Sequence, residues 1–135
     1  MLLYDASLYL NKEKKLGKMI TFPEISKDET RECNTSIRVD SIQSFMVERK
    51  FFNTDTGEIS EKKLLGSGCG YKEVYLVFCL TKERKYCVSS FYGTNQEANL
   101  LQAVYTEAVS NGCEINWEQL GDSIKLFAAL EGETL

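Results

Sequence analysis

The sequence predicts an α+β domain, in which an antiparallel sheet or small barrel of about six to seven short strands is closed by one C-terminal amphipathic helix. Residues 71–80 and 86–92 are rich in β-branched and aromatic side chains, and the five polar residues 81–85 separate them. Such runs favour a β-hairpin, because these side chains pack well on a pleated surface. The amphipathic segment at about residues 95–111 then supplies a helix that covers one face of the hairpin.

Three local signals predict this helix. Thr94 and Glu97 have the spacing of a capping box, in which the hydroxyl accepts a backbone amide and the carboxylate reaches back to the cap. Asn111 and Gly112 predict its end, because glycine tolerates the left-handed conformation that follows a helix. Between these ends, apolar residues recur at helical spacing and form one stripe: Ala98, Leu101, Val104, Tyr105 and Ala108.

Shorter strands are expected ahead of the hairpin. Residues 2–10 alternate between apolar and polar side chains, and residues 18–22 form a second run that Pro23 is expected to stop. The polar segment 11–15 between them is typical of a turn. Residues 24–34 are polar and aperiodic, which predicts a surface loop that is mobile or functional.

Three further strands are expected at residues 37–39, 45–52 and 58–65. The last is polar and is expected at a sheet edge, where its charges discourage pairing with another chain. Helices at residues 44–50 and 60–65 are alternatives, because periodicity over so few residues does not distinguish the two structures.

Beyond the main helix the chain is expected to return to the core. Three apolar residues are predicted to pack there: Ile115, Trp117 and Leu120. Asp122 is a candidate cap for a last short helix that runs through Leu130, and the tail 131–135 is expected to fray.

The length of 135 residues predicts a single domain, which buries roughly two-thirds of its unfolded surface. The element order is compatible with a pleckstrin-homology-like sandwich, although no motif ties the chain to a family. There is no apolar run of about 18 residues and no basic region ahead of an apolar stretch, so we expect a cytoplasmic protein without a membrane span.

Composition excludes several kinds of chemistry. The chain has no histidine, which rules out serine–histidine and cysteine–histidine catalysis and histidine-ligated metals. We therefore expect no enzymatic activity, no metal and no cofactor. The net charge is −4 with both signs interleaved, which argues against affinity that comes mainly from neutralising phosphates.

Five cysteines are present without a Cys-x-x-Cys pair, so neither a zinc site nor a thioredoxin-like site is indicated. Cys79 and Cys87 lie at equal distance from the centre of the polar segment 81–85. In a symmetric register they would face one another across the hairpin. The odd number of cysteines and the expected location favour reduced thiols.

The segment 66–70 is a candidate ligand-binding loop through its glycines and its thiol: Gly66, Gly68, Cys69 and Gly70. Glycine-rich loops bring backbone amides against phosphates when they lead into a helix N-terminus. This loop leads into a strand instead, which favours a plain flexible connection between strands.

Aromatic residues are the remaining candidates for binding. Four tyrosines gather in the central hairpin: Tyr71, Tyr75, Tyr86 and Tyr92. On an exposed sheet face they would stack nucleobases, but few cations accompany them, and core or interface use is favoured. Met46, Phe51 and Phe52 are the best candidates for an exposed apolar patch, because consecutive strand residues point to opposite faces.

These observations favour a non-catalytic module that binds a protein partner or forms a homodimer. Small chains without catalytic motifs are common among phage and mobile-element proteins, so an inhibitor or adaptor of that kind is one form of this hypothesis. The alternative is a single-stranded nucleic-acid or nucleotide-binding protein that uses the tyrosine-rich hairpin and the glycine-rich loop. No membrane partner is expected.

Overall fold

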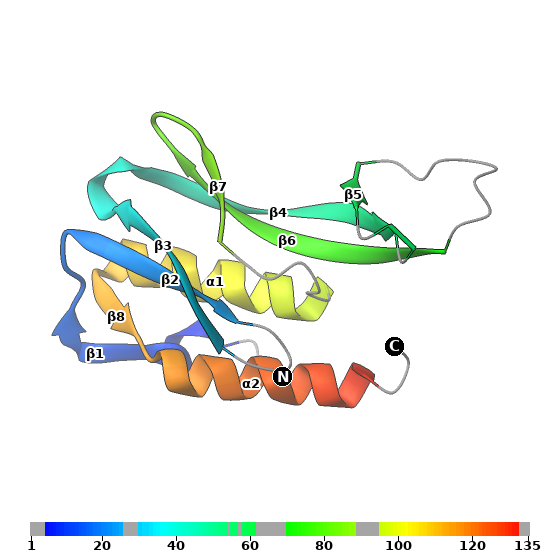
Figure 1. The fold of residues 1–135 in the computed structure, drawn as a ribbon. Coiled ribbons are helices and arrows are strands. Elements are labelled where there is room, and N and C mark those ends of the chain that lie inside the picture. The colour runs from blue at the N-terminus through cyan, green and yellow to red at the C-terminus, as the bar shows by residue number, and fades with distance from the viewer. Residues whose placement is uncertain are drawn as a thin grey trace.

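A computed structural model describes residues 5–25, 30–53, 55–56, 58–61, 70–88 and 95–132. They form an α+β structure with three antiparallel sheets and two helices, which confirms the predicted fold class (Figure 1). Within the described residues the sheets do not close into a barrel. The finer likeness to a pleckstrin-homology sandwich is not confirmed.

The largest sheet has the strand order β5-β4-β6-β7. Its strands are β4 (Ile42–Asn53), β5 (Ile59–Ser60), β6 (Tyr71–Thr81) and β7 (Lys85–Cys87). β4 and β6 pair antiparallel over almost their whole length, with Phe45 opposite Cys79. The strands predicted at 45–52 and 71–80 are confirmed. The strand predicted at 58–65 is confirmed only over β5, and its second half lies outside the described residues.

The main helix α1 (Asn95–Asn111) has the predicted bounds. Gly112 follows it with a φ of 67°, in the left-handed region that glycine tolerates. All five residues of the predicted stripe are buried, and the stripe packs against β4 and β6. Gln102 Nε2 also donates to the carbonyl oxygen of Phe45 at 3.0 Å, which fixes the helix against β4. Thr94, the predicted cap, lies outside the described residues.

The second sheet is a ribbon of two antiparallel strands, β2 (Met19–Ile25) and β3 (Thr30–Arg38). The prediction of a loop over 24–34 is wrong, because both strands extend into that range and only residues 26–29 lie outside the description. Polar composition did not distinguish a loop from a strand here, since one face of an antiparallel ribbon can remain in water.

Pro23 does not stop the second strand as expected. The register of β2 against β3 shifts between Phe22 and Glu24, so the proline lies at an irregularity of the ladder. Proline has no amide hydrogen to give to a partner strand, and such interruptions are where strands accommodate it.

The strand predicted over 2–10 is wrong in its described part, since η2 (Ala6–Tyr9) is a 3₁₀ helix. Asp5 caps it: its carboxylate accepts the Ser7 amide at 3.1 Å and the Ser7 hydroxyl at 2.6 Å. These local bonds compete with strand pairing and favour the turn. Residues 1–4 lie outside the description.

The predicted turn at 11–15 is also wrong. These residues belong to β1 (Leu10–Lys15), which pairs antiparallel with β8 (Cys113–Ile115) in the third sheet. Leu10 lies opposite Ile115, and both are buried. The lysine-rich remainder of β1 is exposed, which hides the strand from a search for apolar alternation.

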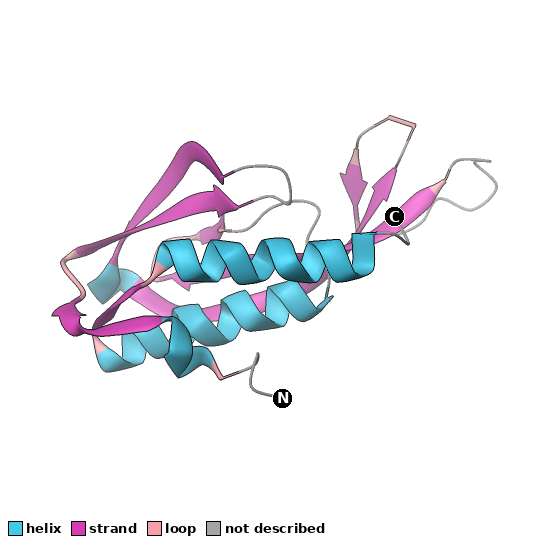
Figure 2. Cartoon of the chain, turned by 90° about the horizontal axis from the view of Figure 1, so that it is seen from below, coloured by secondary structure: helices cyan, strands magenta, loops and turns pink. Residues whose placement is uncertain are grey.

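A second helix, α2 (Trp117–Gly132), is longer than the short helix that the sequence predicted. It begins at Trp117 because Asn116, and not Asp122, caps it: Asn116 Oδ1 accepts the amide of Gln119 at 3.2 Å. Gln119 Oε1 accepts from Asn116 Nδ2 at 3.5 Å in return, so the two side chains also bond to each other. α1 lies between the four-stranded sheet and α2 (Figures 1 and 2).

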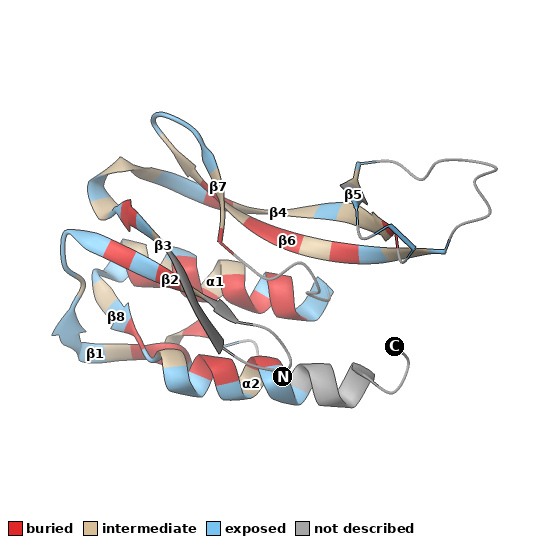
Figure 3. Ribbon diagram, viewed as in Figure 1, coloured by how far each residue is buried: buried red, intermediate tan, exposed pale blue. Residues whose placement is uncertain are grey.

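One hydrophobic core joins all three sheets and both helices (Figure 3). At its centre Phe22 and Tyr105 make an edge-on contact with ring centroids 4.8 Å apart. Phe45 and Trp117 lie 5.5 and 5.8 Å from Tyr105. The predicted return of Ile115, Trp117 and Leu120 to the core is confirmed.

Candidate protein-binding groove

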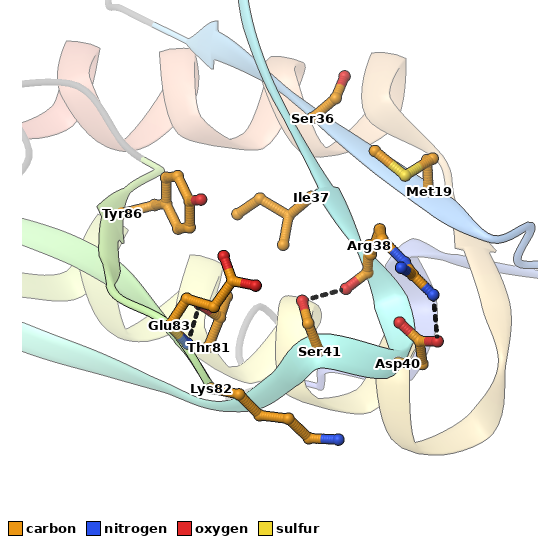
Figure 4. Close-up of a pocket in the computed structure, with 10 residues that line it drawn as sticks. All are labelled: Met19, Ser36, Ile37, Arg38, Asp40, Ser41, Thr81, Lys82, Glu83 and Tyr86. Carbon is orange, nitrogen blue, oxygen red and sulfur yellow. Dashed lines mark hydrogen bonds and ion pairs between the residues drawn. The ribbon is translucent and has the colours of Figure 1, made fainter.

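The edge strands of two sheets face each other across an open cavity of about 380 Å³. β3 is the edge of the ribbon and β7 is the edge of the four-stranded sheet. Ten residues line the cavity: Met19, Ser36, Ile37, Arg38, Asp40, Ser41, Thr81, Lys82, Glu83 and Tyr86 (Figure 4). We call this cavity the β3–β7 groove.

The groove is closed at one end by the corner between β3 and β4. There the 3₁₀ turn η3 (Val39–Ser41) connects the two strands. The Lys82 amide donates to the Ser41 carbonyl oxygen at 3.1 Å, which fastens the β6–β7 turn to this corner. Away from it, β3 and β7 belong to separate sheets and leave the space between them open.

A tight turn holds the β7 wall in place. The Thr81 amide donates to the Arg84 carbonyl oxygen at 3.0 Å, so only Lys82 and Glu83 form the loop. The Thr81 hydroxyl accepts the amides of Glu83 and Arg84 at 3.3 and 3.1 Å. These bonds shorten the five-residue turn that the sequence predicted at 81–85.

The floor of the groove is apolar. Ile37 points from β3 toward the ring of Tyr86 on β7 (Figure 4). Ile37 is buried, and Tyr86 is half-buried against the core. Met19 lines the cavity from the outer face of the ribbon, opposite Arg38, and is 48% exposed, one of the few large apolar side chains so open to water within the described residues.

Charged side chains surround this floor. Arg38 and Asp40 form an exposed ion pair at 2.9 Å. The Arg84 guanidinium lies over the Tyr86 ring, 4.5 Å from its centroid, and hydrogen bonding to Tyr86 raises the pKa of Arg84. The Arg84 cation therefore covers the outer face of the ring that forms part of the floor.

Met19 lies where three cavities meet. A second cavity of about 660 Å³ shares Met19, Arg38 and Asp40 with the groove and adds Gly17, Lys18 and Val39. A third, of about 240 Å³, runs from Met19 toward Trp117. The exposed thioether is thus the centre of an indented region on this side of the molecule.

Of the predicted binding residues that the structure describes, only Tyr86 lines the groove. Met46 and Phe52 are half-buried on the sheet face away from α1, and Glu48 and Lys50 lie between them along β4. Phe51 points to the opposite face and lies under the Arg49 guanidinium at 5.5 Å. The structure therefore does not bring these three residues together as one patch.

The sheet face that carries Met46 is covered by a row of charges, which we call the charge ladder. Lys85 Nζ lies 2.8 Å from Glu48, and Lys50 Nζ lies 3.7 Å from Glu48 and 3.0 Å from Glu61. The hydrogen bond to Glu61 raises the pKa of Lys50. Beneath the ladder, Leu76 is buried opposite Glu48.

The described tyrosines of the hairpin share the α1-facing side of the sheet. Tyr75 and Tyr86 pack against the core. Tyr71 is half-buried, and its hydroxyl oxygen has no hydrogen-bond partner within the described residues. Tyr75 donates to Glu73 at 3.3 Å. This packing places Tyr75 and Tyr86 against protein. Tyr92 lies outside the description.

The predicted pairing of Cys79 with Cys87 is wrong. Cys79 lies opposite Tyr86, and Cys87 lies opposite Phe78, so the two thiols are on different faces of the hairpin. The two-residue loop at Lys82 and Glu83 shifts the register by one residue, which exchanges the faces. Three cysteines are thiols and not disulfides: Cys79, Cys87 and Cys113.

Gly66, Gly68 and Cys69 of the predicted ligand loop lie outside the described residues, and Gly70 is exposed at the start of β6. In the part of the chain that is described, no three potential metal ligands lie together. None of the described helices is long and apolar enough to cross a bilayer.

Met19, Ile37 and Arg38 were not among the residues predicted for binding. No local signal in the sequence marks them, because they become a groove only where the ribbon diverges from the main sheet. Comparison with known proteins gives no further guide: no family model, no curated protein and no solved structure matches the chain.

Proposed function

We propose that this chain is a non-catalytic protein-interaction domain whose partner docks in the β3–β7 groove. The observation that carries the proposal is an open cavity with an apolar floor between the edges of two sheets. Ile37 and Tyr86 form the apolar floor, Met19 adds an exposed apolar side chain on the outer face of the ribbon, and charged residues supply the rim. Buried apolar contacts within a polar rim are typical of protein interfaces.

The chemistry of the groove supports binding more than catalysis. Its hydroxyl groups are those of Ser36, Ser41, Thr81 and Tyr86, and the chain has no histidine to activate them. The Ser41 hydroxyl donates to the Arg38 carbonyl oxygen at 2.7 Å, and the Thr81 hydroxyl closes the turn. These two hydroxyls serve the fold. An adaptor or inhibitor acts by occupying a partner surface, and a groove of this kind is sufficient for that.

A pair of matched variants tests the proposal. Met19→Glu places a charge on the exposed apolar side chain that lines the groove, and Leu126→Glu places one on α2 at a side chain of almost equal exposure, 50% against 48%. Both positions are open to water, so both variants should fold. Each is used as bait in the native cell extract beside the wild-type chain, and retained proteins are quantified by mass spectrometry.

The expected result is a protein that the wild-type chain and Leu126→Glu retain equally and that Met19→Glu loses. Purified partner should then show the same order of affinities in calorimetry. Retention that is equal in all three baits contradicts the proposal. Salt-dependent affinity for single-stranded DNA that Met19→Glu leaves intact favours the nucleic-acid alternative.

A further inference from the structure

The cavity between β2 and β8 differs from the β3–β7 groove in the residues that line it. It has a volume of about 240 Å³ and adjoins the groove, because Met19 lines both. Five of its eight lining residues carry apolar side chains: Leu16, Met19, Ile20, Ile115 and Trp117. Gly17, Thr21 and Glu114 complete the lining, so one carboxylate borders a largely apolar space. We call this space the Trp117 cavity.

Backbone hydrogen bonds hold the β8 wall of this cavity at both ends. Before β8, the Leu16 amide donates to the Gly112 carbonyl oxygen at 2.8 Å. After β8, the Asn116 amide donates to the Tyr9 carbonyl oxygen at 2.8 Å. Glu114 is the middle residue of this strand and is exposed. Its backbone is therefore fixed, while its carboxylate stays open to water.

The indole of Trp117 forms a second fixed wall. Its ring centroid lies 6.2 Å from that of Phe22 and 5.8 Å from that of Tyr105, and both of these residues are buried. Trp117 itself is half-buried at the first residue of α2, so part of it remains to line the cavity. Indole attracts cations more strongly than the rings of tyrosine and phenylalanine do.

Glu114 is the only charged residue that lines the Trp117 cavity. Among the residues that the structure describes, it takes part in no ion pair. The Thr21 hydroxyl, the other polar side-chain group beside it on the wall, is already within 2.8 Å of the Ser36 hydroxyl. Lys18 lines a different cavity, which it shares with Arg38 and Asp40. The carboxylate of Glu114 is therefore available to a cation from outside.

This preference for a cation belongs to the one cavity and not to the whole side of the molecule. The three cavities that meet at Met19 are lined by three cationic and three anionic residues: Lys18, Arg38, Lys82, Asp40, Glu83 and Glu114. In the groove and in the cavity of about 660 Å³ both signs occur, and Arg38 pairs with Asp40 at 2.9 Å. Only the Trp117 cavity is lined by charge of a single sign.

We infer that the Trp117 cavity receives a basic side chain, a lysine or an arginine, of the protein that docks in the β3–β7 groove. The inference rests on the proposed function for the source of this side chain and adds a second contact to it. Because Met19 lines both spaces, a partner in the groove lies next to the cavity. The alkyl stem packs against the apolar walls, and the charged end meets the indole, Glu114 and water.

Two probes with the same alkyl chain test the cavity without the partner. Butylammonium reproduces the side chain of lysine, and butan-1-ol keeps the stem but has no charge. Trp117 is the only tryptophan of the chain, so its fluorescence reports on this cavity. Both titrations of the full chain are run at constant ionic strength. Butylammonium should change the fluorescence saturably, with an affinity about fivefold or more above that of butan-1-ol.

Glu114→Gln removes the charge and nearly keeps the shape of the side chain, and Glu118→Gln is its matched control. Glu118 is also exposed and follows Trp117 directly, but it does not line the cavity. The two variants change the net charge equally. Glu114→Gln should weaken butylammonium about fivefold and leave the affinity for butan-1-ol unchanged. Glu118→Gln should change neither affinity.

Equal affinities of the two probes for the wild-type chain contradict the inference, as does equal weakening of butylammonium by the two variants. In the cell extract, the partner that Met19→Glu loses should bind Glu118→Gln fully and Glu114→Gln about fivefold more weakly. If Glu114→Gln retains this partner in full, the groove stands and the basic side chain is overturned. If no retained protein depends on Met19, the proposed function fails, and a partner in the groove is overturned as the source of the cation.

Discussion

The pKa of the Cys79 thiol depends on the surroundings of this residue. It lies on β6 under α1 and is fully buried, opposite Tyr86. Burial disfavours the thiolate and raises the pKa of Cys79 to about 11. The thiol therefore behaves as a small apolar side chain near neutral pH, and the group is a poor nucleophile in the folded protein.

This shift predicts a loss of stability at high pH. The unfolded thiol ionises near its ordinary pKa of 9.0, whereas the folded thiol keeps its proton up to about 11. Above pH 9.0 the unfolded state thus binds fewer protons, and the free energy of unfolding falls as the pH rises. Chemical denaturation of the wild-type chain should show a steeper decline than Cys79→Ala over this range. Parallel curves would contradict the assignment.

Residue contacts within one helix were predictable, but contacts across the hairpin were not. Ala98, Leu101 and Ala108 could be placed on one face from spacing alone, because helical geometry is regular. The partner of Cys79 depends on the exact length of the turn. The Thr81 hydroxyl shortens that turn, and nothing in the composition of residues 81–85 shows that it does so.

At the scale of elements, the start of α2 is set by one amide side chain. Asn116 and Gln119 satisfy each other's groups at the first turn, while Asp122 lies exposed one turn further along. Both positions have a residue type that caps helices, so the sequence alone offers two starts. The structure shows that Asn116 is the cap. Its backbone amide donates a hydrogen bond to the Tyr9 carbonyl oxygen at 2.8 Å, which holds Asn116 beside the strand pair β1–β8.

Asn116→Ala should therefore lower the free energy of unfolding by about 1 kcal/mol, the usual cost of losing an N-cap. Asp122→Ala is the matched control and should change stability by no more than a few tenths of a kcal/mol, as exposed sites usually do. Urea denaturation measures both. A larger effect at Asp122 than at Asn116 would reverse the assignment of the cap.

Elements with strong apolar patterns were predicted well, and polar ribbons were not. The strands β4 and β6 and the helix α1 carry apolar residues at regular spacing, so periodicity finds them. β1, and the part of β2 and β3 beyond Pro23, consist largely of charged and polar residues. Backbone hydrogen bonds hold these strands together, and such bonds do not require a particular side-chain composition.

At the scale of the whole molecule, one core ties the sheets together. Trp117 is the only tryptophan and lies against Phe22 of the ribbon and Tyr105 of α1. Its fluorescence therefore reports on the contact of three parts of the fold. Far-ultraviolet circular dichroism reports instead on all helices and strands together.

We expect the two signals to change in one transition during urea denaturation. A shared core makes unfolding cooperative, and coincident transitions are the usual test of two-state behaviour. The midpoints should agree within experimental error. A tryptophan transition that precedes the circular dichroism transition would mean that the ribbon separates from α1 as an independent unit.

The candidate groove could not be predicted at any scale below that of the whole molecule. Tyr86 was predicted from its chemistry, but Ile37 comes to face it only because the corner at η3 brings β3 toward β7. Backbone hydrogen bonds join these segments, which are far apart in the sequence; in one of them the Lys82 amide donates to the Ser41 carbonyl oxygen. Cavities of this kind arise from the divergence of two sheets, a property that side-chain patterns do not encode.

The charge ladder has a consequence for how copies of this protein behave toward one another. Its alternating ammonium and carboxylate groups cover Leu76 and Val74, so a neighbour that approaches this surface meets charged groups before it meets apolar side chains. Concentrated salt screens such ion pairs and so weakens the charged cover over the apolar side chains. Crowded solutions should thus remain clear at low ionic strength and turn cloudy as it rises, the reverse of what an attraction between opposite charges would produce.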